Sequence, residues 1–249
     1  MTAPERAPLG AALALLIALV ALTGPLSPVL MAVVAGALAL LLGAAWPDLL
    51  ELPSPRGTRI VVAGAGIVGA ALTVLAPDRL TPVTSLLVVT AVGVFASFGH
   101  QMLRSDRHDL TRSLTGTVAG VLLAAVASCW AIAQEISTAA GGSLLVTAIA
   151  TGLAATLLLD ATSLPVLPRT LLAVVAGTGI TALLAVQLGA MAALPAAGLG
   201  ALVAVAASCT HLLLGSSLVA REPVAALGVA AGPVATAGVI AHLAAAMLT

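Results

Sequence analysis

Eight ionisable side chains recur in the same order in two parts of this sequence, and they are its strongest candidates for chemistry. They are Asp48, Arg56, His100 and Arg112 in the first part, and Asp160, Arg169, His211 and Arg221 in the second. Arginine binds phosphates and carboxylates through paired hydrogen bonds, and histidine can carry a proton near neutral pH. The two groups therefore predict a substrate-binding site for a small anionic solute or a lipid phosphate.

The same residue types also have a purely structural interpretation. Aspartate and arginine at helix ends anchor many membrane proteins, and a histidine can bond a neighbouring carbonyl group. Each of the two histidines, however, lies about one turn inside the end of an apolar stretch, where an ionisable group is costly unless it is paired or hydrated. The sequence leaves both interpretations open.

A second group of polar residues lies between Arg104 and Arg112. Asp106, His108 and Asp109 carry groups that ligate metals or act as acids and bases. Their spacing matches no metal-site pattern and the second half of the chain has no counterpart, so we expect a solvated loop whose arginines contact lipid headgroups. The alternative is the asymmetric site of an enzyme that acts on lipid or polyprenyl phosphates.

Other motifs favour packing over catalysis. Gly64-x-Gly66-x-x-Gly69 has the letters of a dinucleotide-binding loop, but no alternation of strands and helices surrounds it, so close helix packing is the better interpretation. Cys129 and Cys209 lie far apart in apolar runs and are expected to be small buried residues. Serine hydrolase, zinc protease and nucleotide-binding signatures are absent, so we assign no catalytic residue, no metal and no cofactor.

The elements that must position these residues are membrane helices. Hydrophobic residues make up 61% of the 249-residue chain and charged residues only 7%, whereas a soluble domain carries about 25% charged residues. Apolar stretches of about 20 residues, the length needed to cross a bilayer, recur along the whole chain. A net charge of zero provides no basic face for nucleic acid. The chain is therefore predicted to be an all-α, polytopic integral membrane protein that is embedded in the lipid bilayer.

Charges and Gly/Pro clusters divide the chain into about nine predicted transmembrane helices. Their ranges are 9–23, 28–46, 59–76, 82–103, 113–134, 142–159, 170–188, 194–214 and 223–248. Two of the divisions depend on turn residues alone, namely 24–28 and 194–198, where Gly and Pro interrupt long uncharged runs.

The arginines predict the orientation of these helices. With a cytoplasmic N-terminus and an outside C-terminus, eight of the nine arginines fall in cytoplasmic segments and only Arg79 falls outside. The predicted location is the inner or plasma membrane of a cell. The abundance of Ala, Leu, Val, Gly and Arg is typical of a high-GC bacterium.

The recurring polar residues belong to a longer internal duplication with an offset of about 112 residues. Pro55-Arg56 and the glycine-rich run that follows it recur as Pro168-Arg169 and a similar run. The prediction is a single membrane domain, 1–249, that consists of an extra N-terminal helix, 9–23, and two parallel four-helix repeats, 28–135 and 141–248.

A matched glycine motif lies in the last helix of each predicted repeat. Gly116-x-x-x-Gly120 in the first copy corresponds to Gly228-x-x-x-Gly232 in the second. Two glycines four residues apart let helix backbones approach closely. They predict either contact between the two repeats or packing within each repeat.

Together these features favour a transport-type protein, permease-like or flippase-like, with its polar site between the two repeats and open to the cytoplasm. Rocking of one repeat against the other would give alternating access. Two alternatives stay open, a non-catalytic scaffold or subunit of a membrane complex and the membrane-embedded enzyme described above. The scaffold requires a solid interface between the repeats and an apolar surface for a membrane-protein partner or a second copy of the chain.

Overall fold

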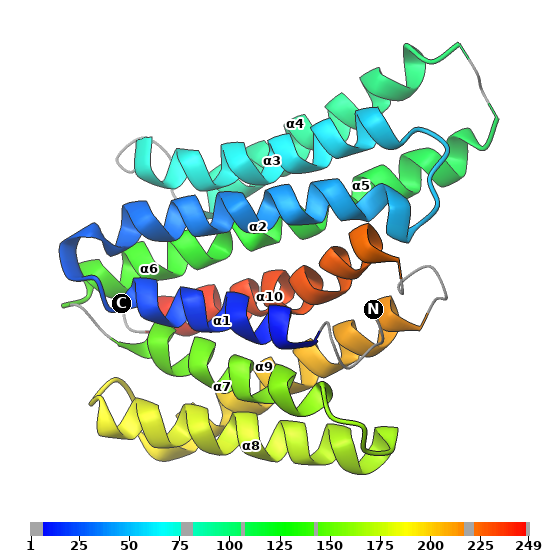
Figure 1. Cartoon of the computed structure of the whole chain (residues 1–249). Helices are drawn as coiled ribbons and strands as arrows, with labels where there is room; N and C mark the ends of the chain where they lie inside the picture. Colours follow the sequence, from blue (N-terminus) through cyan, green and yellow to red (C-terminus); the bar gives the residue numbers. More distant parts are fainter. Residues whose placement is uncertain (1–6, 76–81, 106–107, 142–143, 217–221, 248–249) are drawn as a thin grey trace.

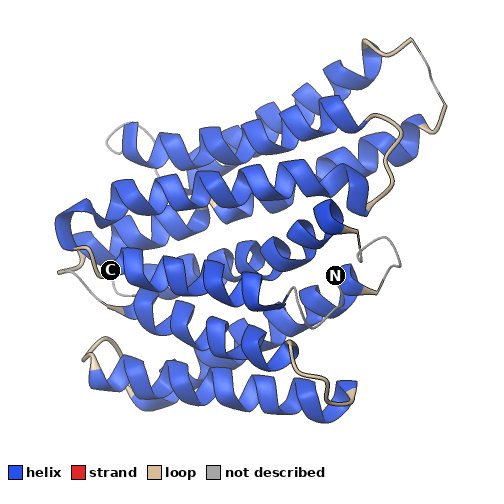
Figure 2. Cartoon of the chain, in the orientation of Figure 1, coloured by secondary structure: helices blue, strands red, loops and turns tan. Residues whose placement is uncertain are grey.

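The computed structural model describes residues 7–75, 82–105, 108–141, 144–216 and 222–247, and within these ranges every regular element is a helix (Figures 1 and 2). The helices are α1 (Ala7–Ala21), the short 3₁₀ turn η2 (Gly24–Leu26), α2 (Ser27–Leu49), α3 (Pro55–Leu75), α4 (Pro82–Met102), α5 (Leu110–Ala127), α6 (Cys129–Ala139), α7 (Leu145–Asp160), α8 (Val166–Gln187), α9 (Ala193–Gly215) and α10 (Pro223–Ala246). The predicted all-α class is confirmed.

The helices have the length and composition of membrane spans. Within the described residues seven of them are long and apolar enough to cross a bilayer, with α5 and α6 taken as one continuous segment, Leu110–Ala139. α1 and α7 are shorter apolar helices. Large apolar side chains such as Leu19, Phe95 and Leu202 are exposed on the outer faces, which is unfavourable in water and expected in lipid. The chain therefore has the fold of a multi-pass membrane protein.

Apart from α6, which continues in the direction of α5, consecutive helices alternate in direction, so their connections collect at two ends (Figure 1). The last residues of α2, α4, α7 and α9 and the first residues of α3, α5, α8 and α10 lie at one end, on the right of the figure. We call it the arginine end, because the described arginines are all in these segments or directly beside them: Arg56, Arg59, Arg104, Arg112 and Arg169. That the arginine end is cytoplasmic stays a prediction.

Two predicted interruptions of the helices differ from the structure. The expected break at 194–198 lies earlier, because Gly189 adopts a positive φ of 66° and α9 already begins at Ala193. Pro195 then occupies the first turn of α9, where a missing backbone N–H costs nothing. The expected helix 113–134 is interrupted at Ser128 and continues as α6 to Ala139, past the half-buried Glu135.

The two cysteines have different environments. Cys129 is buried at the start of α6, as expected, whereas Cys209 is exposed on α9. The expectation of burial is wrong for Cys209, because it lies on the face of α9 that is turned away from the neighbouring helices. Hydrophobic residues on such a face of a membrane helix contact lipid.

α10 lies at the centre of the bundle, between a first unit, α2–α6, and a second unit, α7–α9 (Figure 1). It packs against α2, α5 and α6 on one side and α9 and α7 on the other. Trp130 of α6 is fully buried, and its Nε1 donates a hydrogen bond of 2.8 Å to the Val234 carbonyl of α10. Most of the buried residues of α10 are Ala, Gly and Val, so the helices meet at short range.

The predicted repeats pack their helices differently. α3 contacts α5 in the first copy, whereas α8 and α10, their counterparts, have at most marginal contact. In the second copy α7 instead contacts α9. α1, which has no counterpart in the duplication, packs along α7 and also touches α2 and α10. The sequence duplication therefore stays a prediction, and it does not produce two identical helix arrangements.

Candidate functional site: a polar seam between α7, α8 and α9

Three helices of the second unit meet along matched rows of small and polar residues at intervals of four. The rows are Gly152, Thr156 and Asp160 on α7, Arg169, Ala173, Gly177 and Thr181 on α8, and Gly200, Ala204 and Ser208 on α9. Residues four apart in an α-helix lie on one face. We call this surface of contact the seam.

Glycines bring the three backbones together in the seam. A Cβ on Gly152 would collide with the Thr181 hydroxyl, and a Cβ on Gly177 would collide with the Thr156 hydroxyl. A Cβ on Gly200 would lie 2.8 Å from Cβ of Thr181. Thr hydroxyls therefore occupy the space that the missing side chains leave, and the seam is polar along its length.

The seam ends at the arginine end in a buried ionisable group. Asp160 is 3% exposed, and its Oδ2 accepts a hydrogen bond of 3.0 Å from Ser208 Oγ. Its Oδ1 lies 4.0 Å from Nε of Arg169, an ion pair without a hydrogen bond. His211, half-buried on α9 one turn after Ser208, is close enough to interact electrostatically with both charged groups.

Several buried polar atoms of the seam and its flank lack a hydrogen-bond partner among the described residues. They are Oδ1 of Asp160, Nε of Arg169, and the hydroxyls of Thr170, Thr178 and Thr181. Buried polar atoms in native proteins are nearly always bonded to protein, water or a ligand. At the opposite end the seam is closed by three apolar residues that pack together, Ala148, Ala185 and Ala196. The unpaired groups are thus distributed along the seam and its flank, from Asp160 and Arg169 at the arginine end inward to Thr181.

The first predicted group of polar residues is arranged differently. Asp48 pairs with Arg59, whose NH2 group lies 2.9 and 2.8 Å from its two carboxylate oxygens, and not with Arg56, which is exposed. His100 Nε2 lies 2.9 Å from Ser54 Oγ. These residues form separate local pairs near the surface.

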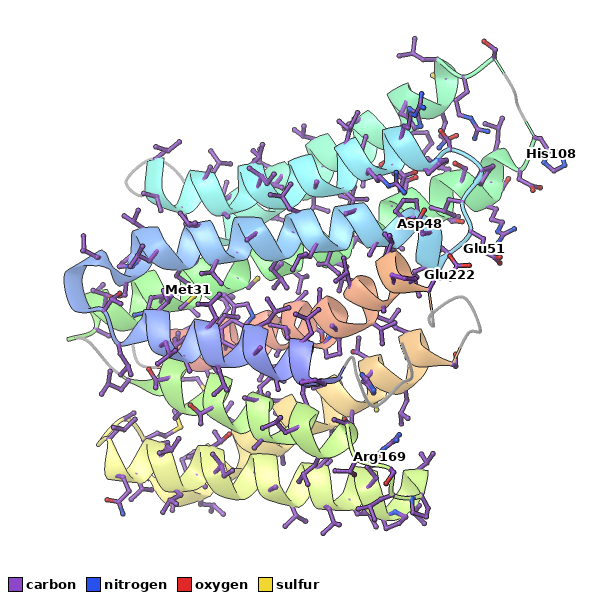
Figure 3. All side chains as sticks on the ribbon, viewed as in Figure 1. Met31, Asp48, Glu51, His108, Arg169 and Glu222 are labelled. Carbon is purple, nitrogen blue, oxygen red and sulfur yellow. The ribbon has the colours of Figure 1, made fainter. Side chains whose placement is uncertain are left out.

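Arg112 also has local partners at the arginine end. It donates a hydrogen bond of 3.0 Å to the Leu50 carbonyl, and its guanidinium lies 3.9 Å from the Glu51 carboxylate. Figure 3 shows Asp48 and Glu51 at the same end of the molecule as Arg169 but on the other side of α1 and α10. Arg221, the last predicted member, lies outside the described residues. The structure thus divides the predicted residues into two separated groups.

Buried polar residues of α3, α4 and α5 in the first unit are, in contrast, well bonded. Gln101 Nε2 donates to Ser113 Oγ at 2.7 Å, and the hydroxyls of Thr58 and Thr117 lie 2.9 Å apart. Arg104 donates to Oε1 of Gln101 at 2.9 Å. The corresponding region of α3, α4 and α5 therefore satisfies its own hydrogen bonds. Unpaired buried atoms also occur at Gln134 and Ser137 of α6 and at His242 of α10, but among the described residues the seam is where they include an aspartate and an arginine that face each other.

The loop predicted as an alternative enzyme site is open to solvent. His108 Nδ1 lies 3.1 Å from an Asp109 carboxylate oxygen, with side chains 79% and 47% exposed, and Figure 3 shows His108 projecting from the molecule. Asp106 lies outside the described residues. Among the described residues no three His, Cys, Asp or Glu side chains gather as metal ligands. This arrangement does not favour an enclosed catalytic site.

The glycine motifs serve close packing, and each in its own way. Gly116 and Gly120 face Leu52 and Trp46 inside the first unit. Gly228 faces Ala45 of α2, across the units, whereas Gly232 faces Leu214 of α9. The sequence allowed either contact between repeats or packing within one, and the second copy has both.

The chain matches no known protein family, no curated protein and no solved structure. The function must therefore be inferred from the site itself.

Proposed function

We propose that this chain is a transport-type membrane protein, permease-like or flippase-like, that binds a small anionic or lipid-phosphate solute at the seam. The observation that carries the proposal is the buried pair of Asp160 and Arg169, whose facing atoms make no hydrogen bond to each other or to the rest of the described chain. Ionisable residues inside a membrane protein are costly, and they mark solute and proton pathways more often than structural contacts.

Arg169 is placed to receive an anion from the arginine end. Its side chain is 18% exposed while the Asp160 side chain is 1% exposed, so the guanidinium lies between solvent and the buried carboxylate. A guanidinium binds phosphate, sulfate or carboxylate oxygens through two parallel hydrogen bonds. His211 on α9 supplies a second nitrogen on the same side. The proposed site lies within the second unit, whereas the sequence had suggested the space between the repeats.

The proposal is tested with the full chain in phosphatidylcholine vesicles. Two solutes separate the possible sources of the phosphate-like group: radiolabelled sulfate, for uptake of a free anion, and fluorescent phosphatidylglycerol, for movement of a lipid headgroup between leaflets. We expect at least one of them to move faster than in protein-free vesicles. Arg169→Gln should abolish the movement, and Arg169→Lys should retain part of it, since a lysine keeps the charge but not the paired bonds.

Arg104→Gln is the matched control. Arg104 also lies at the arginine end and is partly buried, but its hydrogen bond is to Gln101 in the first unit. The substitution removes the same charge from the same end and should leave transport unchanged. Equal rates with and without protein for both solutes, or equal loss in Arg169→Gln and Arg104→Gln, would refute the proposed site.

A non-catalytic subunit of a membrane complex is the second candidate, and the centre of the bundle favours it. α10 meets α6 at short range, with the position of a Cβ on Gly238 only 3.0 Å from Trp130 Cδ1. Such a solid centre is what a scaffold requires. The same vesicle experiment separates the candidates, because a scaffold moves neither solute and loses nothing when Arg169 is neutralised.

A further inference from the structure

We infer that Asp160 takes up a proton when an anion binds Arg169, so that the solute and a proton occupy the seam together. The inference rests on the proposed function and names its coupling ion. Its basis is the juxtaposition of Asp160 Oδ1 and Arg169 Nε, 4.0 Å apart and both without a hydrogen-bond partner among the described residues.

Charge balance at the buried site requires the proton. With Asp160 ionised, the carboxylate and the guanidinium neutralise each other, and an anion that joins them adds an uncompensated negative charge next to a carboxylate that is 3% exposed. Uncompensated charge is strongly unfavourable in a poorly hydrated interior. A proton taken from water by Asp160 restores neutrality when the anion carries a single charge, as a phosphodiester headgroup does, and it halves the excess negative charge when the anion is sulfate. Arg169 and the anion then form the ion pair.

The hydrogen bonds of Asp160 determine which oxygen receives the proton. Oδ2 already accepts a hydrogen bond from Ser208 Oγ at 3.0 Å. Oδ1 is the oxygen that faces Arg169 and has no partner. A proton on Oδ1 turns this atom from an acceptor that repels an anion into a donor that binds one of its oxygens. Protonation thus replaces a repulsion by a hydrogen bond at the same position.

Other charged groups around Asp160 are few. Of the helices that pack on α7, α8 contributes Arg169 and α9 contributes His211, while the described residues of α1 contain no ionisable side chain. On α10, Glu222 is exposed at the start of the helix and His242 lies near its far end. Glu135 of α6 also lies near the opposite end from Asp160. Asp160 and His211 are therefore the two groups whose titration the experiment must separate.

The test measures the binding of sulfate to the full chain in phosphatidylcholine nanodiscs by isothermal titration calorimetry. Sulfate does not change its charge between pH 5 and 9, so any pH dependence belongs to the protein. We expect the affinity to rise about tenfold for each unit that the pH falls, because one proton is bound with each anion. Measurements in two buffers of different ionisation enthalpy should give about one proton taken up per sulfate.

Asp160→Asn is the decisive variant, because a neutral amide imitates the protonated carboxyl group. It should bind sulfate with the same affinity at every pH and take up no proton. Glu222→Gln, which removes an exposed carboxylate near the same end, should behave like the unmodified chain. Infrared difference spectra of the unmodified chain add a test without mutation, since sulfate should convert a carboxylate band into a carboxylic acid band.

The outcomes separate this inference from the proposed function. Sulfate binding that depends on Arg169 but takes up no proton, or proton uptake that survives in Asp160→Asn, overturns the coupling and leaves the anion site standing. If sulfate does not bind but nanodiscs with phosphatidylglycerol produce the carboxylic acid band, the coupled anion is a lipid headgroup. If neither sulfate nor phosphatidylglycerol produces a response that Arg169→Gln removes, both the site and the coupling are refuted.

Discussion

Two glycines of α8, two residues apart, should respond in opposite ways to the same small substitution. A Cβ on Gly177 would collide with the Thr156 hydroxyl and lie 3.1 Å from both Ala204 Cβ and the Gly152 carbonyl oxygen. A Cβ on Gly179 would meet no atom within 4 Å. Gly177→Ala must separate helices and should destabilise by about 1–3 kcal/mol, the usual range for overpacking. Gly179→Ala should be neutral or stabilise by up to about 1 kcal/mol, because alanine favours the helix.

α3 provides the same comparison with the order reversed. A Cβ on Gly66 would collide with Ala39 and lie 2.8 Å from the Ala124 carbonyl oxygen, whereas a Cβ on Gly64 would meet nothing within 4 Å. The duplication aligns Gly64 with Gly177 and Gly66 with Gly179. Gly66→Ala should therefore destabilise the protein and Gly64→Ala should not, although the sequence alignment pairs them the other way.

The four alanine variants are compared by SDS-induced unfolding in mixed micelles, followed by circular dichroism and tryptophan fluorescence. Thermal unfolding gives a second measure, because the Tm of a chain of this size falls by about 2–4 °C for each kcal/mol of destabilisation. The reasoning fails if Gly177→Ala and Gly179→Ala are equally destabilising, or if the aligned glycines Gly64 and Gly177 are the sensitive pair. The first result would show that the two faces of α8 are equally packed, and the second would show that α3 and α8 present the same face to their neighbours.

Two further predictions concern single contacts. Trp130→Phe should destabilise the protein by about 1–3 kcal/mol, since it removes the hydrogen bond to the buried Val234 carbonyl and leaves space in the core. SDS unfolding followed by Trp46 fluorescence measures this loss of stability. A change below about 0.5 kcal/mol, the size expected for a surface substitution, would contradict the prediction. Asp48→Asn should lower the free energy of unfolding by at most about 1 kcal/mol, because the ion pair of Asp48 with Arg59 is partly exposed. In the same unfolding experiment, high salt should reduce the difference in stability between the variant and the unmodified chain. A large loss of stability that does not depend on salt would be inconsistent with a partly exposed ion pair.

The helices of this chain were predictable because crossing a bilayer requires about 20 apolar residues whatever else a sequence does. The residues at which these helices begin and end were harder to predict. α3 begins at Pro55 and α8 at Val166, each about four residues before the predicted start. The prediction stopped at charged residues, but a proline is well placed in a first turn and a long arginine side chain can reach the membrane surface from inside the helix.

The candidate site was only partly predictable. Asp160, Arg169 and His211 stand out because ionisable residues are rare in this chain, and the structure brings these three together. Ser208 and the threonine hydroxyls were missed, since polar residues spaced by four are hard to distinguish among so many Ala, Gly and Thr residues. Arg59, which lies about one turn after Arg56 and was not among the predicted site residues, forms the ion pair with Asp48.

What the sequence could not supply is the rotation of each helix about its axis. A shift of two residues turns a helical position by about 200°, from a neighbouring helix toward lipid. Gly66 and Gly177 are closely packed against neighbouring helices. Gly179, which aligns with Gly66, and Gly64, which aligns with Gly177, face open space. Related stretches of sequence therefore meet different neighbours in the two units, and similarity of sequence does not transfer contacts from one to the other.

This difference in rotation explains why hydrogen bonding distinguishes the two units. In the first unit the polar residues of α3, α4 and α5 face one another, and Gln101 and Ser113 bond directly. In the second unit α9 packs against α7, so that Asp160 accepts a hydrogen bond from Ser208. Arg169 lies 4.0 Å from the same carboxylate and makes no hydrogen bond with it. The polar residues near the arginine end thus form a fully bonded network in α3, α4 and α5 and an incompletely bonded one in α7, α8 and α9. Because buried charge with incomplete hydrogen bonding is costly, the incompletely bonded network is the one at which we propose that an anion and a proton bind.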